Sequence, residues 1–346
     1  MKKYLFSLLT LLILTLAACG KADREPETPR EHVVTVGFSQ VGAESDWRLA
    51  STSSMTEACS EAGYNLILDN ARQKQENQFR AVREFIDQRV DYIVIDPITE
   101  TGWESTLRDA AQAEIPVIIV DREVAVDDGN LYAAWIGENF ELEGEKACAW
   151  LQQFLELEGL KEVNIVHIRG TENSSAQMGR TKALLATAGR CGWNIIASGD
   201  GDFVQAKGRD VMEAMLIEHG RNIQVVYCEN DNMAYGVLQA LDEAGIRVGT
   251  DIRGGEVLVI SFDATRTGLQ YTLSGQIGLN VECSPLYGGE VVALIERMVR
   301  GEETEHRIYL EESQFSTFAG IRELHVNDAV YEIEMLTEEL IAARAY

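Results

Sequence analysis

Asp121 and Arg122 stand side by side at the end of an apolar stretch, IPVIIVDREV, at residues 115–124. The run before them predicts a buried strand. A carboxylate and a guanidinium at the end of such a strand either neutralise each other or face a cleft that receives a polar ligand, because buried charges are costly unless they are paired. The pair alone leaves both possibilities open.

Polar side chains follow nearly every other predicted strand. Asp or Asn after a strand commonly caps the next helix, which is the simplest interpretation of Asn70 and Asp231 taken alone. Parallel sheets, however, bind ligands at the carboxyl ends of their strands, so the whole set indicates a binding edge. The strand-end residues are Ser39, Gln40, Asn70, Asp96, Asp121, Arg122, Arg169, Asp202, Glu229, Asn230, Asp231 and Asp263.

The elements that position these residues alternate between strand and helix from Val33 onward. The predicted strands are continuous apolar runs, which are typical of strands buried on both faces of a parallel sheet. The pattern restarts at about residue 130, and the short crossing at residues 134–139 predicts a hinge. We therefore predict an α/β fold with two doubly wound, Rossmann-like parallel-sheet domains joined by a hinge.

Charge excludes some classes of partner. The chain has 346 residues and a formal net charge of −26. Such a negative field repels nucleic acid, so we expect no nucleic-acid partner. A repressor with this two-domain body would also need an N-terminal DNA-binding segment, and the N-terminus of this chain has a different composition.

The sequence carries no motif for catalysis or metal binding that we recognise. It lacks GxSxG, a P-loop and HExxH, and its six cysteines have no CxxC spacing. Paired carboxylates for glycosidase chemistry stay open from sequence alone, but the strand-end arginines favour binding over bond cleavage. We expect a binding protein with no cofactor and no metal, and not an enzyme.

The N-terminus predicts export. Residues 1–18 combine two lysines, a short apolar run and small residues, which is the composition of a signal peptide. The ending LAAC resembles a bacterial lipobox, and this resemblance implies cleavage before Cys19 and lipidation of that cysteine. Residues 19–32 then form the lipidated end and a flexible polar tether. The predicted location is extracytoplasmic, anchored to the cell membrane.

Motifs along almost the whole mature chain resemble the type I periplasmic sugar-binding proteins of ABC transporters, and most closely their galactofuranose-binding members. The resemblance implies the two-domain fold predicted above. It also implies that Asp121 and Arg122 face a ligand cleft. The matching segments are VGFSQVGAESDWR at 36–48, QKQENQ at 73–78, GW at 102–103, AEIPV at 113–117, DR at 121–122, GDF at 201–203 and ND at 230–231.

The resemblance also implies a set of ligand residues. Their types suit a sugar, because carboxylates accept from adjacent hydroxyls, a guanidinium donates in a planar fork, and aromatic rings cover the C–H face. The implied ligand-binding residues are Gln40, Trp47, Arg48, Asp121, Arg122, Arg180, Phe203, Asn230, Asp263 and Glu282.

The resemblance implies a monomeric lipoprotein that binds a monosaccharide between two lobes and closes by a hinge motion. The ligand would be galactofuranose-like or another furanose or pyranose sugar, and the protein would deliver it to the permease of an ABC importer. The lobes would comprise residues 33–136 with about 284–312, and residues 137–283 with about 313–346. An alternative is a sensor of the same fold that presents its sugar to a membrane receptor kinase, and the sequence does not separate the two.

Overall fold

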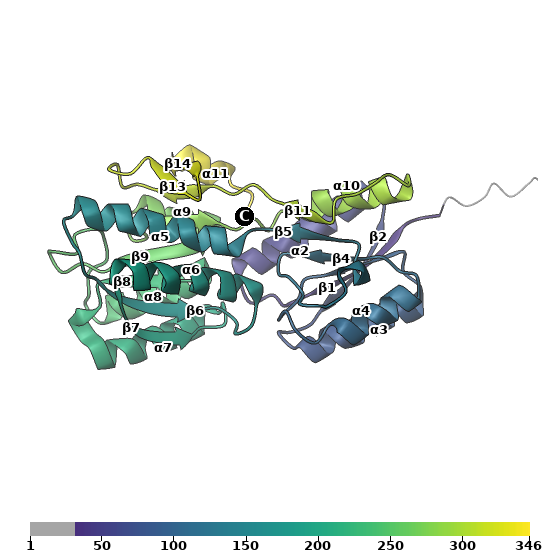
Figure 1. Cartoon of the computed structure of the whole chain (residues 1–346), viewed down its shortest axis with the longest axis horizontal. Helices are drawn as coiled ribbons and strands as arrows, with labels where there is room; N and C mark the ends of the chain where they lie inside the picture. The colour runs from purple at the N-terminus through teal and green to yellow at the C-terminus, as the bar shows by residue number, and fades with distance from the viewer. Residues whose placement is uncertain (1–31) are drawn as a thin grey trace, which may run out of the picture. The chain divides into compact units, whose positions relative to one another are not determined.

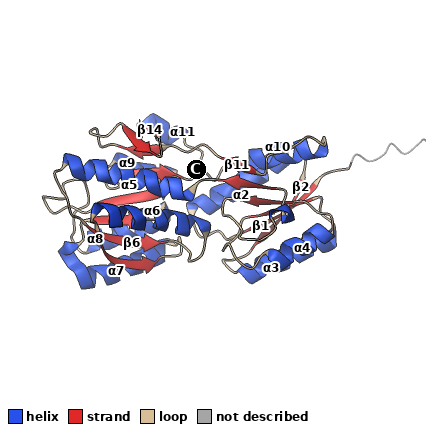
Figure 2. Ribbon diagram, in the orientation of Figure 1, coloured by secondary structure: helices blue, strands red, loops and turns tan. Residues whose placement is uncertain are grey.

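Parallel strands make up most of two sheets in the computed structural model, which describes residues 32–346 (Figure 1). The signal peptide, the lipidation of Cys19 and all but the last residue of the tether, as predicted from the sequence, lie outside the described residues. Strands and helices alternate along most of the chain (Figure 2). The prediction of an α/β fold with two mainly parallel sheets is confirmed.

The first sheet has the strand order β11-β5-β4-β3-β1-β2, and all its neighbouring strands run parallel. Helices α2 and α10 pack together, as do α3 and α4, and Figure 1 shows the sheet between these two pairs. The elements are β1 (Thr35–Gln40), α2 (Asp46–Glu61), β2 (Asn65–Asn70), α3 (Gln75–Gln88), β3 (Tyr92–Ile95), α4 (Glu104–Gln112), β4 (Val117–Val120), η1 (Gly129–Leu131), β5 (Ala134–Gly137), α10 (Gly288–Val299) and β11 (Arg307–Tyr309).

The second sheet has the order β13-β14-β12-β10-β9-β8-β6-β7. Strands β7, β6, β8, β9 and β10 are parallel, whereas β12 and β13 each pair with a neighbour in the antiparallel direction. The elements are α5 (Phe140–Leu157), β6 (Asn164–Arg169), α6 (Ser175–Cys191), β7 (Asn194–Asp200), α7 (Gln205–His219), η2 (Gly220–Asn222), β8 (Val225–Cys228), α8 (Asp231–Glu243), β9 (Leu258–Asp263), α9 (Arg266–Leu273), β10 (Leu279–Glu282), β12 (Gln314–Ser316), β13 (Glu323–Val326), β14 (Ala329–Met335) and α11 (Glu338–Ala343).

Burial separates central strands from edge strands. Every residue of β3, β4, β5 and β8 is buried, as the continuous apolar runs predict. The prediction of burial on both faces is wrong for β2 and β7, which consist of exposed and half-buried residues. Both lie at a sheet edge, where no further strand pairs with their outer side.

The chain passes between the two sheets three times. The first passage is residues 138–139, between β5 and α5, and the second is residues 283–287, between β10 and α10. The third is residues 310–313, between β11 and β12. These three segments, called the crossovers below, are the only connections between the sheets within the described residues, so any relative motion of the sheets must be absorbed there.

Two sequence expectations concern cysteine and membrane helices. The five cysteines of the described residues are all free thiols, and those other than Cys191 are buried, as expected of small apolar side chains. Between residues 32 and 346, no helix has both the length and the apolar character needed to cross a bilayer.

Candidate ligand-binding site

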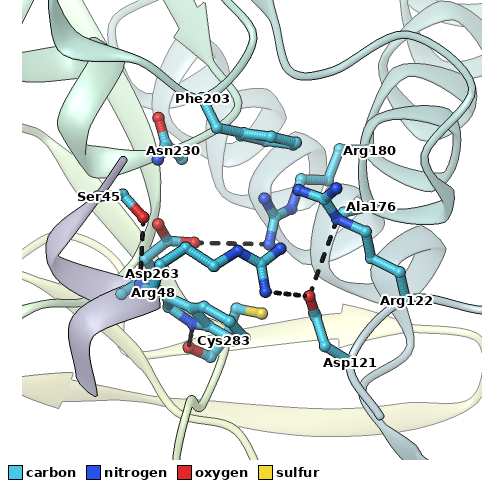
Figure 3. Close-up of a pocket in the computed structure, with 11 residues that line it drawn as sticks. Ser45, Arg48, Asp121, Arg122, Ala176, Arg180, Phe203, Asn230, Asp263 and Cys283 are labelled. Carbon is cyan, nitrogen blue, oxygen red and sulfur yellow. Dashed lines mark hydrogen bonds and ion pairs between the residues drawn. The ribbon is translucent and has the colours of Figure 1, made fainter. Parts of the chain in front are cut away.

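A cavity lies where the strand ends of the first sheet meet those of the second (Figure 3). The centre of a water molecule can move through about 30 Å³ of it, so the cavity is small. Eight of the ten predicted ligand residues line it. The lining residues are Ser45, Trp47, Arg48, Asp121, Arg122, Ala176, Arg180, Phe203, Asn230, Asp263 and Cys283.

Arg48 is fixed on the first turn of α2. Ser45 caps this helix and accepts a hydrogen bond from the Arg48 backbone N–H at 3.2 Å. The guanidinium pairs with Asp96, with Asp121 at 2.9 Å and with Glu44 at 3.5 Å, and it lies 4.5 Å from the centre of the Trp47 ring. Burial alone would lower the pKa of Arg48, but these carboxylates outweigh it and raise the pKa. A cation on the first turn of a helix is disfavoured by the helix dipole, and at Arg48 three acidic partners offset this effect.

Asp121 and Arg122 combine the two possibilities raised by the sequence, since they are partly neutralised by neighbouring groups and they also line the cavity. Asp121 is neutralised mainly by Arg48, because its own neighbour Arg122 is farther away, with Nε 3.8 Å from the carboxylate. Arg122 Nη1 donates to the Ile98 carbonyl at 3.0 Å, while its buried Nε has no hydrogen-bond acceptor among the described residues. Burial, followed by the Arg48 charge, lowers the pKa of Arg122. A donor is thus left for a ligand.

The second sheet contributes Arg180 and Asp263. Arg180 Nε donates to Glu143 at 2.6 Å and Nη1 donates to the Glu229 carbonyl at 2.6 Å. Its Nη2 lies 3.8 Å from Asp263 Oδ1. Burial raises the pKa of Asp263 to about 8, although the charge of Arg180 opposes the shift. At neutral pH Asp263 therefore carries a proton for most of the time and can donate as well as accept.

The loop after β8 is held by its own two polar residues. The Asn230 side-chain oxygen caps α8 by accepting from the Met233 N–H at 2.9 Å, which leaves the amide nitrogen available to the cavity. Asp231 is not among the lining residues, and it accepts hydrogen bonds from Ser261, Thr265 and Asn280. Its function is to join this loop to β9, α9 and β10.

Three of the lining residues have a backbone conformation that side chains rarely adopt. Asp121, Phe203 and Asp263 have φ angles of 57°, 62° and 95°. Non-glycine residues in this region store strain and concentrate at functional sites. Each lies at or just after the end of a strand, where the positive φ turns its side chain toward the cavity (Figure 3).

Aromatic rings cover two walls. Trp47 Nε1 donates a hydrogen bond to the Cys283 carbonyl at 2.7 Å, so the side chain offers the cavity only the face of its ring. The centre of the Phe203 ring lies 5.1 Å from the Arg122 guanidinium. This contact connects the part of the chain that forms the second sheet with the part that forms the first. A ligand between these rings would have apolar surface to cover.

The remaining two predicted residues lie outside the lining. Gln40 Nε2 donates to Ser51 at 2.7 Å and its Oε1 accepts from the Val41 N–H, so its amide braces α2 against β1. Glu282 accepts from the Ser313 N–H at 2.8 Å and pairs with Arg344 at 2.6 Å. Both side chains are engaged in holding the structure together beside the cavity.

Sequence reasoning missed three lining residues. Ser45 had a signal, since a serine before an apolar-periodic segment predicts a helix cap. Cys283 follows the predicted Glu282, but a cysteine without a spaced partner carries no indication of a site. Ala176 has no polar chemistry, and only its place on the first turn of α6 brings it to the cavity.

The two sheets, each with its helices, already touch each other around the cavity. The Asp46 N–H donates to the Asn232 side chain at 3.2 Å, and the Glu123 N–H donates to the Ser175 hydroxyl at 2.9 Å. Together with the contact between Arg122 and Phe203, these bonds leave each charged lining residue 5% exposed or less. The structure therefore represents a closed cleft.

One group of possible metal ligands occurs among the described residues. Asp121, Glu138 and Cys283 each place a carboxylate or thiol atom within 4.8 Å of the others. Asp121 is already paired with Arg48, and burial raises the pKa of the Cys283 thiol well above its usual value. A protonated thiol and an arginine-paired carboxylate are poor ligands for a cation.

Residues 36–303 match the family model described as periplasmic binding protein domain, and the chain belongs to this family. The chain is 37% identical over 306 residues to the galactofuranose-binding protein YtfQ of Escherichia coli K12, covering 88% of this chain and 92% of that protein. The family consists of binding proteins, so the prediction that this is not an enzyme is confirmed.

Two solved structures agree closely with this one. A Mycobacterium smegmatis protein in complex with β-D-fucofuranose gives a TM-score of 0.78 at 36% identity, covering 83% of this chain and 93% of that chain. The periplasmic binding protein component of the arabinose ABC transporter of Shewanella sp. ANA-3, bound to α- and β-L-arabinofuranose, gives 0.77 at 35% identity with the same coverage. The predicted resemblance to galactofuranose-binding members of the family is confirmed by these similarities.

Proposed function

We propose that this protein binds a monosaccharide, in its furanose form, in the cavity between the two sheets and delivers it to an ABC importer. The observation that carries the proposal is the lining itself. Carboxyl, guanidinium and amide groups face two aromatic rings, and they come from both arrays. This is the chemistry that a ring with several hydroxyls and a C–H face requires.

The size of the cavity and the charge of its lining limit the kind of sugar that it can bind. A small cavity suits one sugar ring better than an oligosaccharide. Arg48 and Arg180 already have carboxylate partners, and Arg122 uses one donor on a carbonyl. Because little unpaired positive charge is left, a neutral sugar is favoured over a sugar acid or a sugar phosphate.

The furanose form is supported by the relatives. The protein from Escherichia coli is a galactofuranose-binding protein, and the two solved structures hold fucofuranose and arabinofuranose. At 35–37% identity, a similar ring size is the simplest expectation for this chain.

Delivery follows from closure. Each sheet with its helices acts as one lobe, residues 33–136 with about 284–312 and residues 137–283 with about 313–346. The ligand favours the closed state because only that state makes both sets of contacts. A lipid on Cys19 holds the protein outside the cytoplasm, where the permease receives the closed form.

Isothermal titration of the purified chain tests the proposal. The panel contains L-arabinose, D-galactose, D-fucose, D-ribose and D-glucose, with D-galacturonate as an anionic counterpart of galactose. We expect heat with at least one neutral sugar and none with galacturonate. Arg122→Ala should abolish the heat, whereas Arg80→Ala, at an exposed pair on α3, should leave it unchanged. Silence toward the whole panel would refute the monosaccharide proposal.

A further inference from the structure

A buried carboxyl group stands directly next to the lining of the cavity, within the second sheet and its helices. Glu229 follows the last residue of β8 and precedes Asn230, which lines the cavity. Glu229 itself is fully buried and is not part of the lining. A buried carboxylate is costly unless donors surround it, so its partners indicate what it does.

Three donors converge on the Glu229 carboxyl group. His167 Nε2 lies 2.8 Å from Oε1, and the Thr181 hydroxyl donates to the same oxygen at 2.6 Å. The Gly170 N–H donates to Oε2 at 2.7 Å. Because the Thr181 hydroxyl accepts a hydrogen bond from Gln177 at 2.8 Å, its own hydrogen remains for Glu229. A carboxylate offers only acceptors, so His167 must carry a hydrogen on Nε2.

Two of these donors adjoin residues of the cavity. Thr181 follows Arg180 on α6, and the Glu229 carbonyl accepts from Arg180 Nη1 at 2.6 Å. Gly170 lies against the Phe203 ring so closely that no side-chain carbon could be added to it. Glu229 therefore joins the end of β8 to the end of β6 and to α6, at the points that carry these lining residues.

Arg180 shows what this arrangement achieves. Its Nη1 donates to the Glu229 carbonyl and its Nε donates to Glu143, both at 2.6 Å. These two bonds fix the plane of the guanidinium and leave Nη2, 3.8 Å from Asp263 Oδ1, for the cavity (Figure 3). The backbone is held as well, because the Tyr227 hydroxyl on β8 donates to the Arg180 carbonyl at 3.2 Å. The direction in which Arg180 meets a ligand is thus set by residues outside the lining.

These contacts lie within one lobe. All the residues involved belong to residues 140–282, between the first and second crossovers. Opening of the hinge therefore leaves them together, and Arg180 keeps its direction before a sugar arrives. Such preorganisation raises affinity, because less ordering is needed on binding.

We infer that Glu229, held by His167, is a positioning residue for sugar binding. It orients Arg180 and Asn230 and supports Phe203 from behind, without touching the ligand. The inference rests on the proposed function. The carbonyl of residue 229 holds Arg180 directly, while the carboxylate determines where that carbonyl lies, through its bonds to β6 and α6. A side chain that served stability alone would leave the affinity of the folded protein unchanged.

Isothermal titration of the full chain with the tightest-binding neutral sugar of the panel tests the inference. Glu229→Leu removes the acceptor of all three donors, and sugar should bind about tenfold more weakly. Glu229→Gln keeps an oxygen for the Gly170 N–H, and its amide nitrogen can donate to His167 once the hydrogen of that ring has moved from Nε2 to Nδ1. Because the shape and most of the hydrogen bonds are kept, its affinity should stay within about threefold of the wild type.

Glu256→Leu is the matched control. Glu256 precedes β9 at the end opposite the cavity, and its carboxyl accepts from the Asp251 N–H at 3.0 Å and pairs with Arg247 at 3.2 Å. The same substitution there should lower the midpoint of urea denaturation and leave sugar affinity unchanged. Wild-type affinity in Glu229→Leu would overturn the inference, and so would an equal loss of affinity in Glu229→Leu and Glu256→Leu. An equal loss in Glu229→Leu and Glu229→Gln would overturn it in favour of an effect of charge alone.

Thr181→Val decides the inference if Glu229→Leu does not fold. Valine has almost the shape of threonine and removes only the donor that ties α6 to Glu229. Sugar should then bind about threefold more weakly, because one hydrogen bond to a charged group is lost. Unchanged affinity in this variant would overturn the inference.

¹⁵N NMR separates the inference from the proposed function. If the wild type gave no heat with any sugar, the proposed function would fail, and the orientation of Arg180 would be followed through its Nε–H signal. A shift of this signal in Thr181→Val, together with a His167 hydrogen that moves from Nε2 to Nδ1 in Glu229→Gln, supports the positioning role. An unmoved signal of either residue contradicts it.

Discussion

Replacing Arg48 with methionine should destabilise the protein strongly and in a pH-dependent way. The guanidinium pairs with the buried carboxylates of Asp96 and Asp121, and it is only 4% exposed. Methionine fills most of its volume, but it removes the cation paired with Asp96 and leaves Asp121 only the more distant Arg122, at 3.8 Å. Removing one partner of a buried ion pair costs about 3–5 kcal/mol, and we expect a loss in this range in the free energy of unfolding at pH 7.5.

The pH dependence is the sharper part of this prediction. Burial already raises the pKa of Asp96, although the charge of Arg48 opposes the shift. Without Arg48 the buried Asp96 carboxyl retains its proton to higher pH, and protonation lowers the cost by up to about 1.4 kcal/mol per pH unit. The Arg48→Met variant should therefore regain about 2–3 kcal/mol relative to the wild type between pH 7.5 and 5.5.

Urea denaturation followed by far-UV circular dichroism at the two pH values measures both quantities. Arg80→Met is the control, because its pair with Glu84 has both side chains 58% exposed and should contribute at most about 0.5 kcal/mol. A loss below 1 kcal/mol for Arg48→Met, or the same loss at both pH values, would refute the assignment of Arg48 as the counter-charge of this carboxyl pair.

Three further predictions concern other lining and supporting residues. Asp231→Ala strips the acceptor from donors on Ser261, Thr265 and Asn280, and should lower the free energy of unfolding by about 3–5 kcal/mol in urea; a loss under 1 kcal/mol would contradict its structural role. Phe203→Leu keeps an apolar wall but loses the ring, and titration should show sugar affinity about tenfold weaker, whereas unchanged affinity would place the ring outside the contact. Burial raises the pKa of Asp263 to about 8, so the contribution of this group to the free energy of unfolding falls as pH rises from about 4 to 8. Asparagine does not titrate, so in urea denaturation the free energy of unfolding of Asp263→Asn minus that of the wild type should increase over this window; a decrease would contradict the raised pKa.

Much of the site could be predicted from strand ends. Asp121, Arg122, Asn230 and Asp263 all follow apolar runs, and the topology rule for parallel sheets places such residues at one edge. Arg180 lies inside a helix and has no such signal, so it could be named only through the resemblance. The fold was predictable because local periodicity and chain order determine a doubly wound sheet.

What the sequence could not supply are the long-range pairings. Asp96 was visible as a strand end, but nothing in the chain indicates that its partner is Arg48, on another element. Gln40 also follows a strand, yet α2 packs close enough for Ser51 to engage its amide. The edge positions of β2 and β7 depend on strand order, which local hydrophobicity does not encode.

The central claim is that the cavity holds one sugar ring in its furanose form. The most direct test is ¹³C NMR of [1-¹³C]-L-arabinose with the protein in molar excess, because the C1 resonance distinguishes furanose from pyranose. We predict a protein-bound furanose signal that disappears in Arg122→Ala. A bound pyranose signal would contradict the ring form. No bound signal for arabinose, or for ¹³C1-labelled galactose or fucose in the same experiment, would contradict the claim as a whole.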